Sequence, residues 1–273
     1  MSTAVATDRF DLTKPIGTEL RGVKLSQLDE AGITEIKELV AERGVLFFRE
    51  QDMTLAEQVD LGRRLGELHV HPAAAAPEGF PEVLVVHTDA NSKRTAGEGW
   101  HSDVSCDERP PALSMLRVET TPPVGGDTLF ASMYEAYESL SEPLRQFLTP
   151  LKAVHSGDLY RNLYAAAGAE KKFPESEHPV VRTHPITGRK VLYVNSGFTR
   201  RIVGLGSRES RAILDMLFDH IAYSVKGQVR FRWEPNSVAL WDNRCVQHHA
   251  SWDYYPDTRH GYRVTTVGER PYQ

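Results

Sequence analysis

Short strand-like runs separated by turn residues restrict the fold of this chain more than any other feature. Residues 228–233 alternate strictly, with Val229, Phe231 and Trp233 on one face and polar residues on the other, which is the period of a half-buried strand. Gly, Pro or Asn turns separate the runs, and 185–188 has the composition of a hairpin turn between two of them. The other runs lie at residues 83–86, 112–118, 127–130, 180–183, 190–194, 238–241 and 259–267.

Helix signals are fewer. The first 50 residues predict a strand, a helix over 32–43 that ends at Gly44, and a buried strand at 45–48. Capping signals open further helices at Thr54 with Glu57 (to about Leu65), at Ser132 with Glu135, and at Ser207 or Ser210. The last of these carries a core-facing stripe made of Ile213, Met216, Leu217 and Ile221. Many short strands with peripheral helices predict a mostly β jelly roll, which is a cup.

The sequence predicts a single domain over residues 1–273, because no repeat, low-complexity tract or Gly/Ser linker divides it. The segment from about 155 to 177 lacks clear periodicity and carries Gly, Lys and Glu. We expect it to form a mobile lid. Neither a G-x-G-x-x-G nor a P-loop motif is present, so a nucleotide-binding crevice is not expected.

Composition excludes several classes of partner. The formal net charge is −5 and no Lys/Arg block is longer than two residues, which argues against general nucleic-acid binding. No apolar run approaches the roughly 18 residues that a membrane span needs, and the N-terminus lacks the pattern of a signal peptide. With only two cysteines, the chain fits the reducing cytoplasm. A homo-oligomer is compatible with the sequence, which leaves the oligomeric state open.

Two segments carry side chains that bind metal ions. In an extended segment His101 and Asp103 project from the same face, so an imidazole and a carboxylate can converge on one ion. A second segment, 241–249, ends in His248 and His249. Neighbours on a strand point to opposite sides, so one of these two histidines is expected to join the site, and spacing alone does not choose between them. Two histidines and one carboxylate form the facial triad of non-haem Fe(II) oxygenases.

A third segment, 259–267, carries two arginines. Arg259 and Arg263 are four residues apart and share one face of the predicted strand, roughly 13 Å from each other. An arginine that points into a barrel needs an anion, and its planar fork suits carboxylates. The alternative is that this face of the strand is exposed to solvent.

Taken together, these segments resemble the taurine dioxygenase (TauD/TfdA) family of Fe(II)/2-oxoglutarate-dependent dioxygenases. The likeness runs from about Gly17 to Pro271 and is carried by an ordered set of motifs: W-H-S-D at 100–103, G-G-D-T-L at 125–129, W-D-N-R-x-x-Q-H at 241–248, and an arginine eleven residues after that histidine. The resemblance implies a distorted jelly roll, also called a double-stranded β-helix. It also implies Fe(II) as cofactor with 2-oxoglutarate and O₂ as co-substrates.

The resemblance implies a role for each matching residue. Fe(II) would be held by His101, Asp103 and His248, with His249 outside the coordination shell. Thr128 and Arg259 would bind the distal carboxylate of 2-oxoglutarate. Substrate contacts would come from His71, Val104, Phe198 and Arg263, the last of which matches the arginine that holds a sulfonate in taurine dioxygenase.

The substrate implied is a small organic anion, such as a sulfonate, an alkyl sulfate or a carboxylate, that is hydroxylated while succinate and CO₂ are released. In related halogenases the carboxylate ligand is replaced, so Asp103 favours hydroxylation. Two positions that contact the amine of taurine in the family differ here: alanines fill 73–76, and a Gly/Glu stretch surrounds Gly97. We therefore expect taurine to be a poor substrate. The rival interpretations are a metal-dependent hydrolase and a non-catalytic barrel that binds a small anion.

Overall fold

The computed structural model describes residues 8–70, 76–93, 95, 97–158 and 174–273. Its largest sheet has seven strands in the order β1-β2-β3-β13-β5-β15-β4. Only the β2–β3 pair in this sheet is parallel. The strands are β1 (Asp8–Asp11), β2 (Thr18–Arg21), β3 (Val45–Phe48), β13 (Ser237–Asp242), β5 (Pro111–Thr120), β15 (Arg259–Val267) and β4 (Leu84–Thr88).

A second sheet packs against the first and closes the barrel. It consists of β12 (Gln228–Phe231), β6 (Thr128–Ser132) and β14 (Val246–Ala250), all antiparallel. Aromatic side chains join the two sheets: Phe47 of β3 stacks on Phe231 of β12 at 4.1 Å, and Phe130 of β6 lies 5.7 Å from Trp241 of β13. Because each strand turns apolar side chains toward the other sheet, the two sheets share one buried core. The jelly-roll prediction is confirmed.

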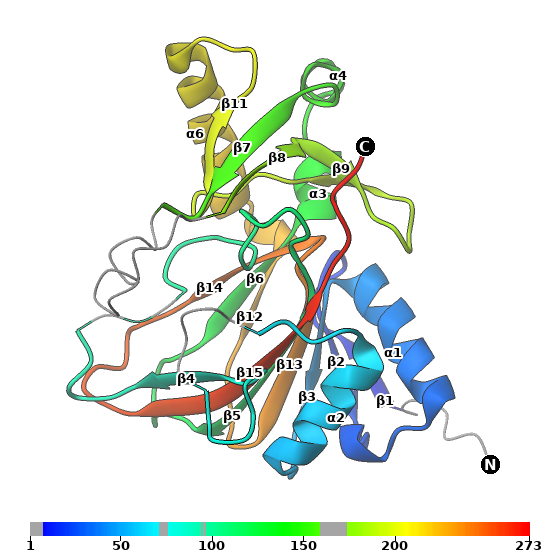
Figure 1. The fold of residues 1–273 in the computed structure, drawn as a ribbon, viewed down its shortest axis with the longest axis vertical. Coiled ribbons are helices and arrows are strands. Elements are labelled where there is room, and N and C mark those ends of the chain that lie inside the picture. Colours follow the sequence, from blue (N-terminus) through cyan, green and yellow to red (C-terminus); the bar gives the residue numbers. More distant parts are fainter. Residues whose placement is uncertain (1–7, 71–75, 94, 96, 159–173) are drawn as a thin grey trace.

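Two helices, α1 (Glu30–Arg43) and α2 (Leu55–Leu65), cover the outer face of the large sheet (Figure 1). The predicted capping box is present, since the Thr54 side chain accepts from Glu57 N and Glu57 accepts from Thr54 N. Gly44 ends α1 with φ 75°, and a Cβ there would lie 2.7 Å from Val246 Cγ2. A separate apolar cluster fills the space between these helices and the sheet.

The remaining elements form a smaller body at one end of the barrel, at the top of Figure 1. One part is the sheet β11-β7-β8, with β11 (Thr199–Ile202), β7 (Lys152–Ser156) and β8 (Glu175–Pro179), and another is the hairpin of β9 (Val181–Thr183) and β10 (Lys190–Leu192). The helices here are α3 (Met133–Glu138), α4 (Glu142–Leu148) and α6 (Ser207–Ala222), followed by a short 3₁₀ turn at Val225–Gly227. Another 3₁₀ turn, Leu25–Gln27, packs against α2. Among the described residues, no helix combines the length and apolar character needed to cross a bilayer.

The structure corrects two predictions in this body. The ends of the segment expected to be a lid, 155–177, belong to paired strands, with Ser156 opposite Glu175; residues 159–173 lie outside the described part. The strand signal was missed because β8 reads Glu-Ser-Glu-His-Pro, with no apolar alternation. In α6 the buried residues are Ser210, Leu214, Leu217 and Ile221, whereas Met216 is 39% exposed.

Candidate active site

His101, Asp103 and His248 come together because two distant segments pair through their backbones. His101 lies in the connection between β4 and β5, and His248 lies on β14. His101 N donates to His248 O at 3.2 Å and His248 N donates to His101 O at 2.8 Å, so the two residues form an isolated bridge. This pairing places their rings 4.2 Å apart, with Asp103 one residue beyond Ser102 on the same side.

The three side chains present ligand atoms to one point. His101 Nε2 lies 4.0 Å and His248 Nε2 lies 3.9 Å from Asp103 Oδ1, and all three ligand atoms lie within 4.8 Å of one another. His101 Nδ1 bonds Gly99 O at 2.9 Å, which makes Nδ1 the donor and leaves the Nε2 lone pair to face the cluster. His249 points elsewhere, with its ring 5.7 Å from that of Trp100. Of the two adjacent histidines, His248 joins the cluster.

The cluster has the protonation state that a divalent cation requires. Burial lowers the pKa of His101, and burial followed by the neighbouring His101 lowers the pKa of His248 well below its ordinary value. Burial would raise the pKa of Asp103, but Arg263 and the two histidines outweigh it and hold that pKa below its usual range. Two neutral imidazoles and one ionised carboxylate on one side of an ion match the donor set of non-haem Fe(II) sites.

Arg259, at the start of β15, is buried, and no described Asp or Glu forms an ion pair with it. Its side chain is 5% exposed, and its guanidinium lies 5.2 Å from the ring centre of Trp233. Arg259 Nε and Nη2 have no hydrogen-bond partner among the described residues. Trp233 Nε1 also donates to Thr128 Oγ1 at 3.0 Å, which leaves the hydroxyl proton of Thr128 free to meet an anion. A buried cation with open donors fits a carboxylate ligand such as that of 2-oxoglutarate.

Arg263, on the same strand, faces the cluster directly. Arg263 Nη1 donates to Asp103 Oδ1 at 2.8 Å, and Arg263 Nε is buried with no hydrogen-bond partner in the described part of the chain. Both arginines therefore lie on the barrel side of β15, as their spacing predicts. A small cavity adjoins Arg263 and Asp103, and its other walls include His69, Glu82, Leu84 and Val104.

The remaining predicted residues have mixed outcomes. Val104 lines the cavity with φ 39°, a left-handed conformation that is rare for a β-branched residue and marks strain beside Asp103. Phe198 is buried, and its neighbour Gly197 packs so closely that a Cβ would lie 2.9 Å from His101 Cβ. His71 lies outside the described residues, as do 73–75 of the alanine run. His69 and Glu82 were not predicted, because an isolated charged residue carries no local signal for a cavity wall.

Comparison with known proteins agrees with this geometry. The model of the taurine catabolism dioxygenase TauD, TfdA family matches residues 8–265. The chain belongs to the TauD/TfdA family. A Schizosaccharomyces pombe relative is 42% identical over 96% of this chain and 69% of its own length. An alpha-ketoglutarate-dependent sulfonate dioxygenase of Saccharomyces cerevisiae is 37% identical, covering 95% of this chain and 66% of that protein.

Other members of the TauD/TfdA family match over most of both chains. An alpha-ketoglutarate-dependent sulfate ester dioxygenase from Pseudomonas putida is 36% identical over 98% of this chain and 92% of its own. The crystal structure of a taurine dioxygenase from Burkholderia xenovorans superposes with a TM-score of 0.84, at 38% identity, over 97% of this chain and 90% of that one. The family uses Fe(II), 2-oxoglutarate and O₂, and this protein is an Fe(II)/2-oxoglutarate-dependent dioxygenase.

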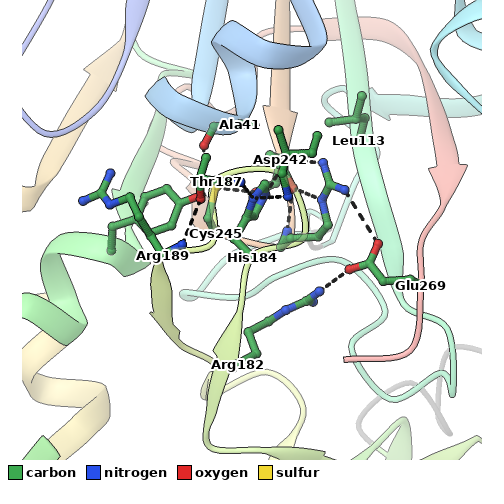
Figure 2. Close-up of polar contacts among 12 residues, drawn as sticks. Ala41, Leu113, Arg182, His184, Thr187, Arg189, Asp242, Cys245 and Glu269 are labelled. Atoms are coloured by element: carbon green, nitrogen blue, oxygen red, sulfur yellow. Dashed lines mark hydrogen bonds and ion pairs between the residues drawn. The ribbon is translucent and has the colours of Figure 1, made fainter. Parts of the chain in front are cut away.

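A second group of possible ligands consists of His184, Asp242 and Cys245 (Figure 2). Its donor atoms are already engaged. Asp242 accepts from Arg244 through both carboxylate oxygens, at 2.8 and 2.6 Å, and from His184 Nε2 at 3.1 Å. His184 Nδ1 accepts from the backbone N–H groups of residues 186 and 187. Burial raises the pKa of Cys245 well above its ordinary value, so it is a thiol rather than a thiolate ligand. The group is a structural network of this TauD/TfdA domain.

Proposed function

We propose that this dioxygenase hydroxylates a small organic anion, a sulfonate or an alkyl sulfate, at the carbon that carries the anionic group. In this proposal His101, Asp103 and His248 bind Fe(II), Thr128 and Arg259 bind the distal carboxylate of 2-oxoglutarate, and Arg263 binds the anionic group of the substrate. Val104 and Phe198 would shape the substrate side of the site, together with His71.

Two arginines on one strand carry the proposal: Arg259, which is buried, and Arg263, whose side chain is 15% exposed. Arg259 has two donor nitrogens without a described partner, and Arg263 has one. Leaving such groups unpaired away from water is costly, so each is expected to meet an anion during turnover. Two separate anions are expected, because the arginines stand four residues apart on β15. The names of the sulfonate and sulfate ester dioxygenases among the relatives support the choice of substrate class.

Each residue of the site has a defined task in this reaction. The neutral histidines and ionised Asp103 offer three ligand atoms and leave the other positions around the metal open. When bound, Fe(II) and 2-oxoglutarate supply the activation of O₂ that oxidises a substrate C–H bond. Arg263 orients the substrate, because its fork fixes the anionic group and so the position of the adjacent carbon. The buried walls keep water away from the reacting carbon.

The chemistry balances for a sulfonate. One oxygen atom of O₂ enters the C–H bond next to the sulfonate, and the other enters succinate as 2-oxoglutarate loses CO₂. The hydroxylated carbon then breaks its bond to sulfur, which gives an aldehyde, sulfite and a proton. An alkyl sulfate releases sulfate in the same way.

Taurine is expected to be a poor substrate. The cavity wall beside Arg263 contains Leu84 and Val104, which favour an apolar tail. Glu82 also lines it, but this carboxylate pairs with Arg63 at 2.8 Å and is not left to hold an ammonium group. The two free cysteines, both buried, fit a cytoplasmic setting.

Succinate release tests the proposal. Fe(II)-loaded protein is assayed with taurine, longer alkyl sulfonates, alkyl sulfates and aryloxy acids, under air and without O₂. We expect turnover only with O₂ and 2-oxoglutarate, the highest kcat/KM for a long-chain sulfonate or sulfate, and a loss of roughly 10- to 100-fold in Arg263→Ala. The surface variant Arg270→Ala, at a side chain 68% exposed, is the matched control.

Three results would contradict the proposal. Product formation without O₂ would indicate a metal-dependent hydrolase. Binding of anions with no turnover of any panel member would indicate a non-catalytic barrel. A preference for taurine would refute the substrate assignment and implicate Glu82 in holding its amine.

A further inference from the structure

The two carboxylate oxygens of Asp103 have different surroundings. Oδ1 faces the Nε2 atoms of His101 and His248, at 4.0 and 3.9 Å, and accepts a hydrogen bond from Arg263 Nη1 at 2.8 Å. Oδ2 points the other way and accepts a hydrogen bond from Ser114 Oγ on β5 at 2.8 Å. The carboxylate is therefore oriented before any ion arrives, with one oxygen toward the cluster and the other held by the sheet.

The amide of Asn243, in the turn between β13 and β14, has only one reasonable orientation. Its Oδ1 accepts from Trp241 Nε1 at 3.0 Å and from Asp103 N at 3.2 Å. Both groups can only donate, so the oxygen must face them and the Nδ2 group must face the opposite side. There Asn243 Nδ2 donates to Ser114 Oγ at 2.9 Å.

The orientation of Asn243 fixes the direction of the Ser114 proton. A hydroxyl has one proton and two lone pairs. Since Ser114 Oγ accepts from Asn243, its proton is left for Asp103 Oδ2, and Thr265 Oγ1 at 3.2 Å can fill the second lone pair. Ser114 and Asn243 are at most 1% exposed and Thr265 is 8% exposed, so water does not compete for these bonds.

The same network reaches a second residue of the cluster. Trp241, which donates to Asn243, packs against the ring of His248 with centroids 4.8 Å apart. Asn243 thus links the backbone and side chain of Asp103 to the residue that supports His248. No local sequence signal predicts Ser114, which reads as an ordinary strand residue; Asn243 belongs to the W-D-N-R motif, but its partners are far away in the chain.

We propose that Asn243 and Ser114 are positioning residues that restrict Asp103 to binding the metal through Oδ1 alone. The inference rests on the proposed ligand set. Because Oδ2 accepts from Ser114, turning both oxygens toward one ion would break this hydrogen bond. A single-oxygen contact leaves three of six coordination positions for the keto acid and O₂. Residues that orient ligands in this way commonly change metal affinity by about 10- to 100-fold when they are replaced.

Co(II) titration of the metal-free protein, without 2-oxoglutarate, tests this relay, the chain of hydrogen bonds from Asn243 through Ser114 to Asp103. Ser114→Ala removes the donor to Oδ2, and Asn243→Asp replaces the amide donor by an acceptor, which turns the Ser114 proton away from Asp103. We expect both variants to bind Co(II) about 10- to 100-fold more weakly than wild type, with a changed visible absorption band. Thr265→Val is the control, because it leaves the Asn243–Ser114–Asp103 chain intact and is expected to change affinity less than threefold.

Two comparisons separate failure of the relay from failure of the ligand assignment. Thermal unfolding and circular dichroism of each metal-free variant establish that it is folded; if Asn243→Asp does not fold, Ser114→Ala alone decides. Wild-type Co(II) affinity in Asp103→Ala would overturn the ligand set itself. If Asp103→Ala loses Co(II) while folded Ser114→Ala keeps wild-type affinity and spectrum, the ligand set stands and the relay is wrong.

Discussion

At the scale of single residues, Arg259 offers the sharpest test of co-substrate binding. Burial lowers its pKa, two of its nitrogens have no hydrogen-bond partner among the described residues, and its guanidinium lies over the ring of Trp233, which donates to Thr128. Arg259→Ala should weaken 2-oxoglutarate binding by roughly one to two decades, since a charge-assisted contact is worth about 1.5–3 kcal/mol. Arg259→Lys should recover only part of the lost affinity for 2-oxoglutarate, because an ammonium group cannot reproduce the planar fork of a guanidinium.

The measurement is the apparent affinity for 2-oxoglutarate in succinate-release kinetics. Arg211→Ala on α6 is the matched control, since that side chain is 79% exposed and its partner is Asp215 of the same helix. Equal affinities in wild type and Arg259→Ala would move the carboxylate site to another part of the barrel.

At the scale of secondary-structure elements, the turn between β13 and β14 is tied to two other parts of the chain, the β9 region and the segment after β15 (Figure 2). Asp242 accepts hydrogen bonds from His184, which follows β9, and from Arg244. The Arg244 guanidinium also lies 3.6 Å from Glu269, beyond β15. Arg182 of β9 bonds Glu269 as well. This network fixes the turn from which β14 carries His248 into the active site, so its effect on function is indirect.

Asp242→Asn should destabilise the protein by about 3–5 kcal/mol, because it leaves Arg244, 10% exposed, without its main counter-ion. Urea unfolding measures the free energy. Glu138→Gln is the control: its pair with Arg189 is 48% and 40% exposed, and the loss should stay below about 1 kcal/mol. A small change in Asp242→Asn, comparable with the control, would mean that the network contributes little to the fold.

At the scale of the whole molecule, stability should fall in two steps as the pH is lowered. His155 and His178 are fully buried around Tyr193 in the smaller body, and burial lowers the pKa of His155 well below its usual value and that of His178 to about 4. The unfolded chain takes up these protons near pH 6.5, before the folded protein does. The contribution of the two neutral histidines to the free energy of unfolding is thus complete above pH 6.5. It declines toward pH 4 by about 1.4 kcal/mol per pH unit for each histidine.

The second step involves the buried carboxylates. Burial opposes ionisation of Asp242, but Arg244 and His184 outweigh it and lower its pKa, so this contribution is present above about pH 4 and is lost below it. Urea unfolding from pH 7 to pH 3 measures both steps. In His178→Gln, the free energy of unfolding should fall less steeply between pH 6.5 and 4, and the second step should remain. A constant unfolding free energy from pH 7 to 5 would contradict the assignment to the histidines.

Features that depend on short-range geometry could be predicted from the sequence. The capping box at Thr54 forms because its partner is three residues away, and strands with one apolar face, such as β12, show their period directly. The spacing of His101 and Asp103 likewise allows both to face one ion, and the ordered motifs identified the family. These signals survive folding because each is settled within a few residues of backbone.

Features that depend on partners far apart in the chain became visible only in the folded protein. Strands β8 and β14 carry polar residues, because β8 is partly exposed and β14 turns His248 toward the site, so no apolar alternation marked them. His248 rather than His249 faces Asp103 because β14 pairs with β6 and with His101 in one register. The bonds of Asn243 and Ser114 to Asp103 join β13, β5 and the β4–β5 connection. A side chain's hydrogen-bond partner is a property of strand order, and strand order is fixed by packing of the whole core.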